Sequence, residues 1–265
     1  MRIALVSLNQ HWLDKDTNAQ YCRQFIQESK KRGCDLVIFP EMTLTGYSLE
    51  VNSFTENLSD SWTLSTFHQL AKSIDINIIF GALLSYRGNS PENCLCLATP
   101  FATSAVYSKL HPFTFVGEEK VLLAGNSLGY VDLLDVRLGA SICYDLRFPV
   151  IFSLMASKCF GVICIANWPQ SRVNHWRTLL IARAIENQMI MIGVNRVGVD
   201  GNGLFYEKSS MVVLPNGDIS LPTSSSEELD IYDVDFAMTT KARQEFPTLR
   251  DGNFERYQEL YFNQN

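Results

Sequence analysis

The sequence predicts a mixed α/β protein, and three observations predict it. Short apolar runs with the length of buried strands recur along the chain, and longer segments with helical spacing lie between some of them. Two further segments have the strand–turn–strand pattern of antiparallel neighbours. Two sheets covered by helices would accommodate all of these elements.

The apolar runs are predicted to be strands buried on at least one face, because they consist mainly of branched and other apolar residues and are bounded by polar or turn-forming ones. The predicted strands span residues 3–8, 36–39, 76–84, 94–98, 138–143, 162–166, 189–194 and 211–214.

Four segments are predicted to be helices. The first, residues 17–32, carries apolar Tyr21 and Phe25 and is followed by Gly33, a residue favoured just after helix ends. The next two cover about residues 62–74 and residues 147–158. The last, residues 172–188, has apolar residues on one helical face. These residues are Val173, Trp176, Leu180 and Ala184.

Residues 94–109 and 209–236 are predicted to contain antiparallel strands, the second around a turn at 215–217. Residues 222–228 are predicted to be a solvated loop. The chain shows no repeat and no clear domain boundary, so we expect one domain over residues 1–265. The tail at about residues 247–265 is polar but has several aromatic residues, and it is a candidate to pack on a neighbouring element or at an oligomer interface. Its aromatic residues are Phe254, Tyr257, Tyr261 and Phe262.

Composition and charge exclude several classes of protein. The chain has 265 residues, of which 46% are hydrophobic and 19% charged, so it can bury a large core and is neither disordered nor fibrous. A net charge of −6 argues against nucleic-acid binding. The first apolar run is too short for a signal sequence or a membrane span, so we expect a cytoplasmic protein that does not bind membranes. The seven cysteines lie mostly in apolar stretches and are expected to be free thiols.

Three segments bring reactive side chains to strand ends, where ligands of α/β sheets gather. They are LVIFPEMTLTGY at 36–47, AVYSKLHPF at 105–113 and GASICYDLRFP at 139–149, and they supply Glu41, Lys109 and Cys143. A thiol needs a neighbouring base or cation to become an attacking thiolate, and Glu41 can take its proton. Lys109, helped by the backbone N–H of Tyr144, can stabilise an oxyanion.

FPEMTLTGY, YSKLHPF and GASICYDLRFP resemble the signature segments of the nitrilase superfamily of carbon–nitrogen hydrolases, each with one member of its Glu–Lys–Cys triad. Residues 166–172, 175–188 and 193–206 are similar to the branch that contains omega-amidases, which hydrolyse the terminal amide of 2-oxoglutaramate. The resemblance extends over roughly residues 1–250. It implies a four-layer α-β-β-α sandwich, a homodimer, and hydrolysis of a small amide through a cysteine thioester, with no metal or cofactor.

The resemblance also implies roles for individual residues. Glu41 is the general base, Lys109 the oxyanion stabiliser and Cys143 the nucleophile. A second glutamate helps to place the lysine and the substrate; Glu118 is the better fit, and Glu119 is its rival. Residues 116–117 depart from the relatives, so the local loop and its pocket are expected to differ.

A substrate with a carboxylate opposite its amide calls for an arginine that can bind it. Arg147 and Arg172 follow strand ends and are the candidates, although each could instead pair with acids or cover a helix terminus. Trp168, Tyr47 and Phe115 are candidates for the pocket walls, and Trp168 could equally be a core residue.

The same residues allow other interpretations. His111 or His175 could activate Cys143 in place of Glu41, although nothing around Cys143 resembles a cysteine protease. Cys94 and Cys96 lack a second pair at ligand spacing and are expected to be core residues rather than metal ligands. The runner-up functions are an amidase of another small amide, such as deaminated glutathione or a carbamoyl compound, and a non-catalytic binding protein on the same fold.

Overall fold

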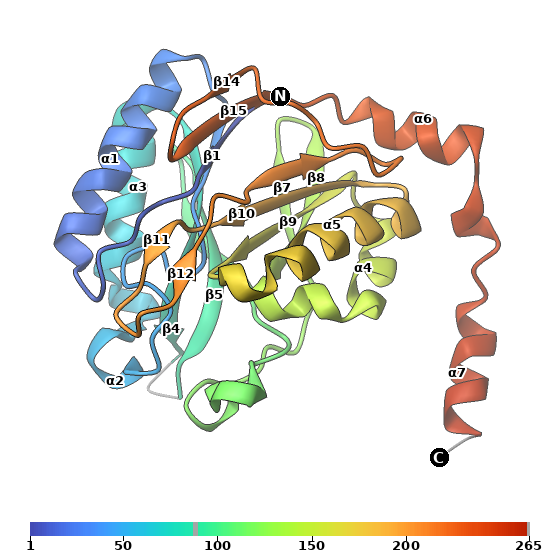
Figure 1. Cartoon of the computed structure of the whole chain (residues 1–265), viewed down its shortest axis with the longest axis horizontal. Coiled ribbons are helices and arrows are strands. Elements are labelled where there is room, and N and C mark those ends of the chain that lie inside the picture. The colour runs from blue at the N-terminus through green and yellow to red at the C-terminus, as the bar shows by residue number, and fades with distance from the viewer. Residues whose placement is uncertain (87–89, 264–265) are drawn as a thin grey trace.

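Two β-sheets lie at the centre of the molecule, shown in Figure 1 as a computed structural model that describes residues 1–86 and 90–263. The strands of the first sheet are β1 (Arg2–Val6), β2 (Leu36–Ile38), β3 (Glu56–Asn57), β4 (Asn77–Ser85), β5 (Glu92–Ala98), β6 (Thr103–Ser108), β14 (Ser224–Ser225) and β15 (Leu229–Asp233). Their order is β14–β15–β1–β2–β4–β5–β6, with β3 beside β4. The pairs β1–β2 and β2–β4 are parallel, whereas β4–β5, β5–β6 and β1–β15 are antiparallel.

The second sheet contains β7 (Gly129–Leu133), β8 (Val136–Ile142), β9 (Gly161–Ala166), β10 (Ile190–Asn195) and β13 (Met211–Val213). Its order is β13–β10–β9–β8–β7, and its three central strands are parallel. A small antiparallel pair, β11 (Gly198–Val199) and β12 (Phe205–Tyr206), stands apart from both sheets. The predicted mixture of parallel and antiparallel pairing is confirmed.

The helices lie outside the two sheets. They are α1 (Lys15–Lys31), α2 (Val51–Phe54), α3 (Trp62–Ile74), α4 (Pro149–Ala156), α5 (Val173–Asn187), α6 (Ala237–Glu245) and α7 (Phe254–Phe262). Of these, α1, α3, α4 and α5 cover the outer faces of the sheets. Polar side chains cap three of the helices, because the first backbone N–H groups of a helix have no partner within it. Asp14 accepts a hydrogen bond from the N–H of Thr17 at 3.0 Å, and Ser61 accepts one from that of Leu64 at 3.0 Å. Asn253 accepts one from that of Arg256 at 2.9 Å.

Three apolar clusters separate four layers. The first lies between α1, α3 and the first sheet and contains Ile26 and Phe67. The second lies between the two sheets, where Ile3 of β1 packs in the same cluster as Leu138 of β8. The third lies between the second sheet and α4 and α5, and it contains Trp176. The predicted α-β-β-α sandwich is confirmed, with α1 and α3 on one side of Figure 1 and α4 and α5 on the other.

Two predicted elements differ from the structure. The helix expected at 147–158 is split: residues 143–147 form a separate 3₁₀ helix and α4 begins at Pro149, because Phe148 before the proline is extended. The antiparallel strands expected at 209–236 are present, but not as one hairpin: around the turn only Val213 and Ile219 form a bridge, whereas β14 and β15 form an antiparallel pair. The chain then crosses to the other sheet, where β15 pairs with β1. Strand β7 was not predicted.

The tail carries α7, which hangs away from the two sheets in Figure 1. Several of its apolar side chains are exposed, among them Leu260 and Phe262. Over the described part of the chain, no helix combines the length and the apolar character needed to cross a bilayer.

All seven cysteines are free, as predicted, and burial raises the pKa of every thiol. A thiol whose folded-state pKa is raised contributes stability that is complete below its unfolded pKa and is lost as the pH rises above it. We expect each buried thiol to cost about 1.4 kcal/mol of unfolding free energy for every pH unit above about 8.5. Urea unfolding at about pH 8 and pH 10 measures this loss. Between these pH values, the Cys22→Ala variant should lose less unfolding free energy than the wild type. An unchanged urea midpoint of the wild type would contradict the expectation.

Candidate active site

Glu41 lies on a buried loop that follows β2. Gln10 supports this loop from one side, because its Nε2 donates to the carbonyl oxygens of Glu41 at 3.1 Å and Met42 at 2.8 Å. Gly81 of β4 supports it from beneath, since a Cβ atom at this position would lie 2.4 Å from the backbone nitrogen of Met42. Met42 itself has a positive φ of 46°. The loop therefore holds Glu41 by close backbone packing.

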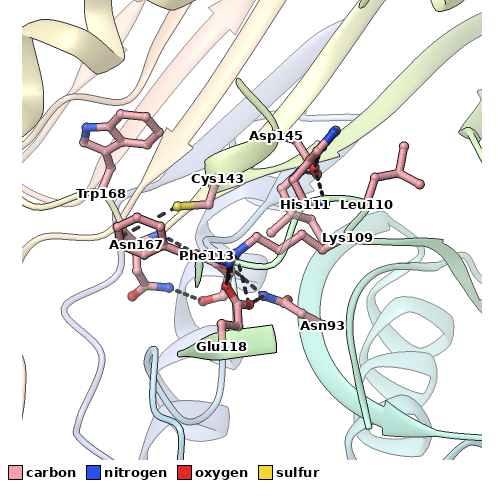
Figure 2. Close-up of polar contacts among 12 residues, drawn as sticks. Asn93, Lys109, Leu110, His111, Phe113, Glu118, Cys143, Asp145, Asn167 and Trp168 are labelled. Carbon is pink, nitrogen blue, oxygen red and sulfur yellow. Dashed lines mark hydrogen bonds and ion pairs between the residues drawn. The ribbon is translucent and has the colours of Figure 1, made fainter. Parts of the chain in front are cut away.

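Lys109 follows β6 and lies between two carboxylates (Figure 2). Its Nζ is 2.8 and 3.0 Å from the two carboxylate oxygens of Glu118 and 3.3 Å from Oε1 of Glu41. The backbone N–H of Phe113 also donates to Glu118, at 2.6 Å. The side chains of all three charged residues are at most 2% exposed. Glu118 thus contacts the lysine, whereas its rival Glu119 is exposed.

Two asparagines orient the carboxylate of Glu41. Asn93 Nδ2 donates to Oε1 at 2.7 Å and is 3.4 Å from Oε1 of Glu118. The backbone N–H of Asn167 donates to Oε2 of Glu41 at 2.9 Å. Each oxygen of Glu41 therefore has a fixed donor, and the carboxylate has one orientation.

Cys143 lies where β8 turns into the 3₁₀ helix Cys143–Arg147. Its φ of 47° is unusual for a residue other than glycine, and such strained backbone is common at functional sites. Six of the seven cysteines are buried and only Cys143 is partly exposed. Its Sγ lies 4.0 Å from the carbonyl oxygen of Asn167. The turn thus leaves Cys143 only partly exposed, beside the segment whose Asn167 also contacts Glu41.

The charges of the cluster act on one another. Burial alone would lower the pKa of Lys109, but Glu41 and Glu118 outweigh it and raise that pKa well above its usual value, so the ammonium is charged at neutral pH. Burial raises the pKa of the Cys143 thiol well above its usual range, and Glu41 adds to this effect while Lys109 opposes it. The thiol is therefore protonated at rest, and it needs a base at the moment of attack.

A pocket with a volume of about 80 Å³ opens over Cys143. It is lined by Tyr47, Lys109, Phe113, Val116, Cys143, Tyr144, Arg147, Asn167, Trp168, Pro169, Arg172, Leu204 and Tyr206. Of the side chains predicted to bind substrate, the lining therefore includes Tyr47, Tyr144, Arg147, Trp168 and Arg172.

Phe115, predicted as a wall, does not line this pocket. Its side chain is 82% exposed. The neighbouring Phe113 takes the place expected for it, because the chain turns at Gly117, which has a φ of 82°, to bring Glu118 back under Lys109.

Both candidate arginines stack on aromatic rings at the pocket. The Cζ atom of Arg147 is 4.8 Å from the ring centre of Trp168, and that of Arg172 is 5.8 Å from the ring centre of Phe113. Trp168 is almost fully buried and donates from its Nε1 to the carbonyl oxygen of Arg172 at 2.7 Å. Within the described residues, neither guanidinium lies within 4.0 Å of a carboxylate. Neither guanidinium is therefore neutralised by an acidic side chain, although Nη2 of Arg147 lies 3.3 Å from Nδ1 of His175.

The two histidines considered as alternative bases have other contacts. His111 Nδ1 is 2.8 Å from a carboxylate oxygen of Asp145, and His175 Nδ1 is 3.3 Å from a nitrogen of Arg147. Neither side chain lines the pocket around Cys143. Cys94 and Cys96, considered as metal ligands, are buried in the apolar cluster under α3.

Sequence reasoning missed several residues at the site, among them Asn93, Asn167, Leu204 and Tyr206. Asn93 lies inside a strand, and nothing in its apolar surroundings indicates a polar role. Asn167 directly follows a predicted strand, and this position could have been recognised as a strand-end signal. Leu204 and Tyr206 reach the pocket from the segment 193–206, whose similarity to the omega-amidase branch assigned no role to either residue.

An α-β-β-α sandwich that holds a buried Glu–Lys–Glu cluster beside a thiol has the groups needed for nucleophilic catalysis. The chain belongs to the carbon–nitrogen hydrolase family, whose family model matches residues 2–244.

Relatives support this assignment over nearly the full chain. The chain is 31% identical to Omega-amidase YafV from Escherichia coli (strain B / BL21-DE3), with 96% of this chain and 97% of that protein covered. It is 29% identical to 2-oxoglutaramate amidase from Bacillus subtilis (strain 168), with 86% and 88% covered. A CN-hydrolase superfamily protein from Xanthomonas campestris, solved with an arsenic adduct in its active site, superposes with a TM-score of 0.88 at 31% identity, with 96% and 97% covered.

Proposed function

We propose that this protein hydrolyses the terminal amide of a short ω-amide such as 2-oxoglutaramate to a carboxylate and ammonia. The observation that carries the proposal is the placement of the Cys143 thiol in one pocket with Lys109, itself bracketed by Glu41 and Glu118. Relatives named omega-amidase and 2-oxoglutaramate amidase support amide hydrolysis and this substrate.

In the first half of the reaction, Cys143 loses its proton to Glu41 and its sulfur attacks the amide carbon. The negative charge that develops on the amide oxygen is stabilised by the Lys109 ammonium and by the backbone N–H of Tyr144, which lies in the first turn of the 3₁₀ helix. Glu41 then gives its proton to the amide nitrogen as the C–N bond breaks. Ammonia leaves, and the acyl group remains on Cys143 as a thioester.

In the second half, Glu41 takes a proton from a water molecule that attacks the thioester carbon. The same oxyanion donors stabilise the second tetrahedral intermediate, and the carboxylate product leaves as the thiol regains its proton. Glu118 holds the ammonium of Lys109 in place throughout. The cycle needs no group beyond these side chains and water.

Arg147 and Arg172 are proposed to bind the distal carboxylate of the substrate, and Trp168 and Tyr47 to form walls of its pocket. Removing one charged hydrogen bond costs about 1.5–3 kcal/mol, so Arg147→Gln and Arg172→Gln are each expected to raise KM for 2-oxoglutaramate by about 10- to 100-fold. We expect kcat to change little, since this contact is equal in the ground and transition states. Steady-state kinetics measure the effect, with Arg137→Gln, which removes a surface pair with Asp132, as the control. An unchanged KM in both variants would exclude this binding site.

The proposed function is tested by ammonia release from 2-oxoglutaramate and from pentanamide, an uncharged amide of the same length. We expect release from 2-oxoglutaramate at a kcat/KM at least about 100-fold higher, because pentanamide leaves the arginines unpaired. No release from 2-oxoglutaramate by folded protein would overturn the substrate. Trapping of acyl-enzyme on Cys143 with deaminated glutathione or carbamoyl compounds would then identify the amide.

We further propose that the protein is a cytoplasmic homodimer and that the tail contributes to the interface. The exposed aromatic side chain of Phe262 on α7 supports the interface, and the buried free thiols suit a reducing compartment. Light scattering of the 30.0 kDa chain is expected to give twice that mass. A chain that ends at residue 247 should form a weaker dimer, which dissociates at a higher protein concentration than the full chain does. A monomeric mass for the full chain would refute the dimer.

A further inference from the structure

Asp145 lies two residues after the nucleophile and is completely buried. Four donors surround its carboxylate. Oδ1 accepts from the backbone N–H of His111 at 3.0 Å and lies 2.8 Å from Nδ1 of the same residue. Oδ2 accepts from the hydroxyl of Tyr107 at 2.7 Å and from the backbone N–H of Ile142 at 3.0 Å. A carboxylate suits this position because it only accepts hydrogen bonds.

These donors come from the two segments that carry the reacting groups. Ile142 directly precedes Cys143, whereas Tyr107 and His111 flank Lys109 at two residues on either side. The hydroxyl of Tyr107 also accepts from the backbone N–H of Leu110, so it braces the same segment twice. Figure 2 shows Asp145 and His111 in contact on the side of Lys109 away from Glu118.

His111 is held in this arrangement by its ring as well. The ring stacks on Phe148 with a centroid distance of 3.8 Å and an interplanar angle of 7°. Since its Nδ1 faces Asp145, the histidine contributes to positioning and not to proton transfer at the thiol.

We propose that Asp145 is a positioning residue that holds the backbone carrying Cys143 and the backbone carrying Lys109 at a fixed separation. The inference rests on the proposed function, because it assigns the ammonium and the thiol to one reaction. Glu118 already holds the ammonium of Lys109 on one side. Asp145 fixes the backbone that carries Lys109 on the other side, so the lysine is positioned from both sides. Displacement of reacting groups by about 1 Å can cost about 10²-fold in rate.

Asp145→Asn tests the proposal. It replaces one accepting oxygen by an NH₂ group, which would face the groups that now donate hydrogen bonds to the carboxylate. We expect kcat for 2-oxoglutaramate to fall by about 10²-fold while KM changes less than about threefold. The matched control is Asp230→Asn. Asp230 is also buried, accepts from Lys208 at 2.7 Å and lies outside the pocket lining, so its loss should lower stability without changing kcat.

Alkylation of Cys143 by iodoacetamide, followed by mass spectrometry across pH, gives a readout that needs no substrate. The charged groups around this thiol are Glu41, Lys109 and Glu118, and Lys109 alone of the three favours the thiolate. If the ammonium moves away in Asp145→Asn, alkylation at about pH 8 should slow about tenfold and its pH profile should move to higher pH. Asp230→Asn should keep the wild-type profile.

The outcomes separate the two proposals. A wild type that releases no ammonia refutes the proposed substrate, and the alkylation profiles then still decide the role of Asp145. A variant with wild-type kcat and alkylation but a lower melting temperature would overturn the positioning role. If Asp145→Asn does not fold, Tyr107→Phe removes one donor only; a loss of kcat of about tenfold supports the brace, and an unchanged kcat refutes it.

Discussion

Cys143→Ala is expected to reduce ammonia release by at least about 10⁴-fold, because no other group in the pocket can form the covalent intermediate. The free energy of unfolding should change by less than about 1 kcal/mol, since Cys143 is partly exposed and its side chain carries no buried ion pair. Single-turnover assays and urea unfolding of the same preparation measure both quantities. Cys22→Ala, which removes a fully buried thiol from the helix–sheet core, is the control and should keep full activity.

Hydroxylamine separates this expectation from a mechanism in which water attacks directly. Hydroxylamine intercepts a thioester and yields a hydroxamate, so the wild type should form hydroxamate and Cys143→Ala should form none. Residual hydroxamate formation by the variant, above the level of the buffer, would show that another group accepts the acyl chain.

The residues proposed to react could be identified in the sequence because each lies in a short segment with its own signal. An apolar run ends at Glu41, at Lys109 and at Cys143, and this pattern places all three at strand ends. The strands themselves were predictable for the same reason, since β1, β9 and β10 are continuous apolar runs.

The residues that orient the reacting groups could not be predicted in this way. The hydrogen bond from Asn167 to Glu41 joins residues 126 positions apart, and Asn93 meets Glu41 across 52 positions. The first contact depends on how the two sheets stack and the second on the order of strands within the first sheet, and no local pattern encodes either. Phe115 was misplaced for a related reason, because the backbone N–H of Phe113 bonds to Glu118, a contact within the folded loop that the sequence does not show.

Lys109→Met is expected to remove activity by at least about 10³-fold and also to destabilise the fold. Without the ammonium, Glu41 and Glu118 are two fully buried carboxylates that share one site without a cation. Breaking a buried ion pair by removing one partner costs about 3–5 kcal/mol. We therefore expect a decrease of this size in the free energy of unfolding at pH 8, measured by urea denaturation.

The pH dependence identifies the cause of this loss. In the wild type, the raised pKa of Lys109 means that its stabilisation is fully present below its ordinary value near 10.5 and is lost only above it, so it is constant between about pH 5.5 and 8. In Lys109→Met, repulsion should raise the pKa of one carboxylate, which takes up a proton as the pH falls and restores part of the stability. The difference in unfolding free energy between the variant and the wild type should thus be smaller at about pH 5.5 than at pH 8.

Adding Glu118→Gln to the Lys109→Met variant removes one of the two buried charges. This double variant should recover stability at pH 8 without recovering activity. Repulsion between buried carboxylates must weaken when one of them is protonated. A difference in unfolding free energy that does not depend on pH would therefore assign the lost stability to the packing of the methionine.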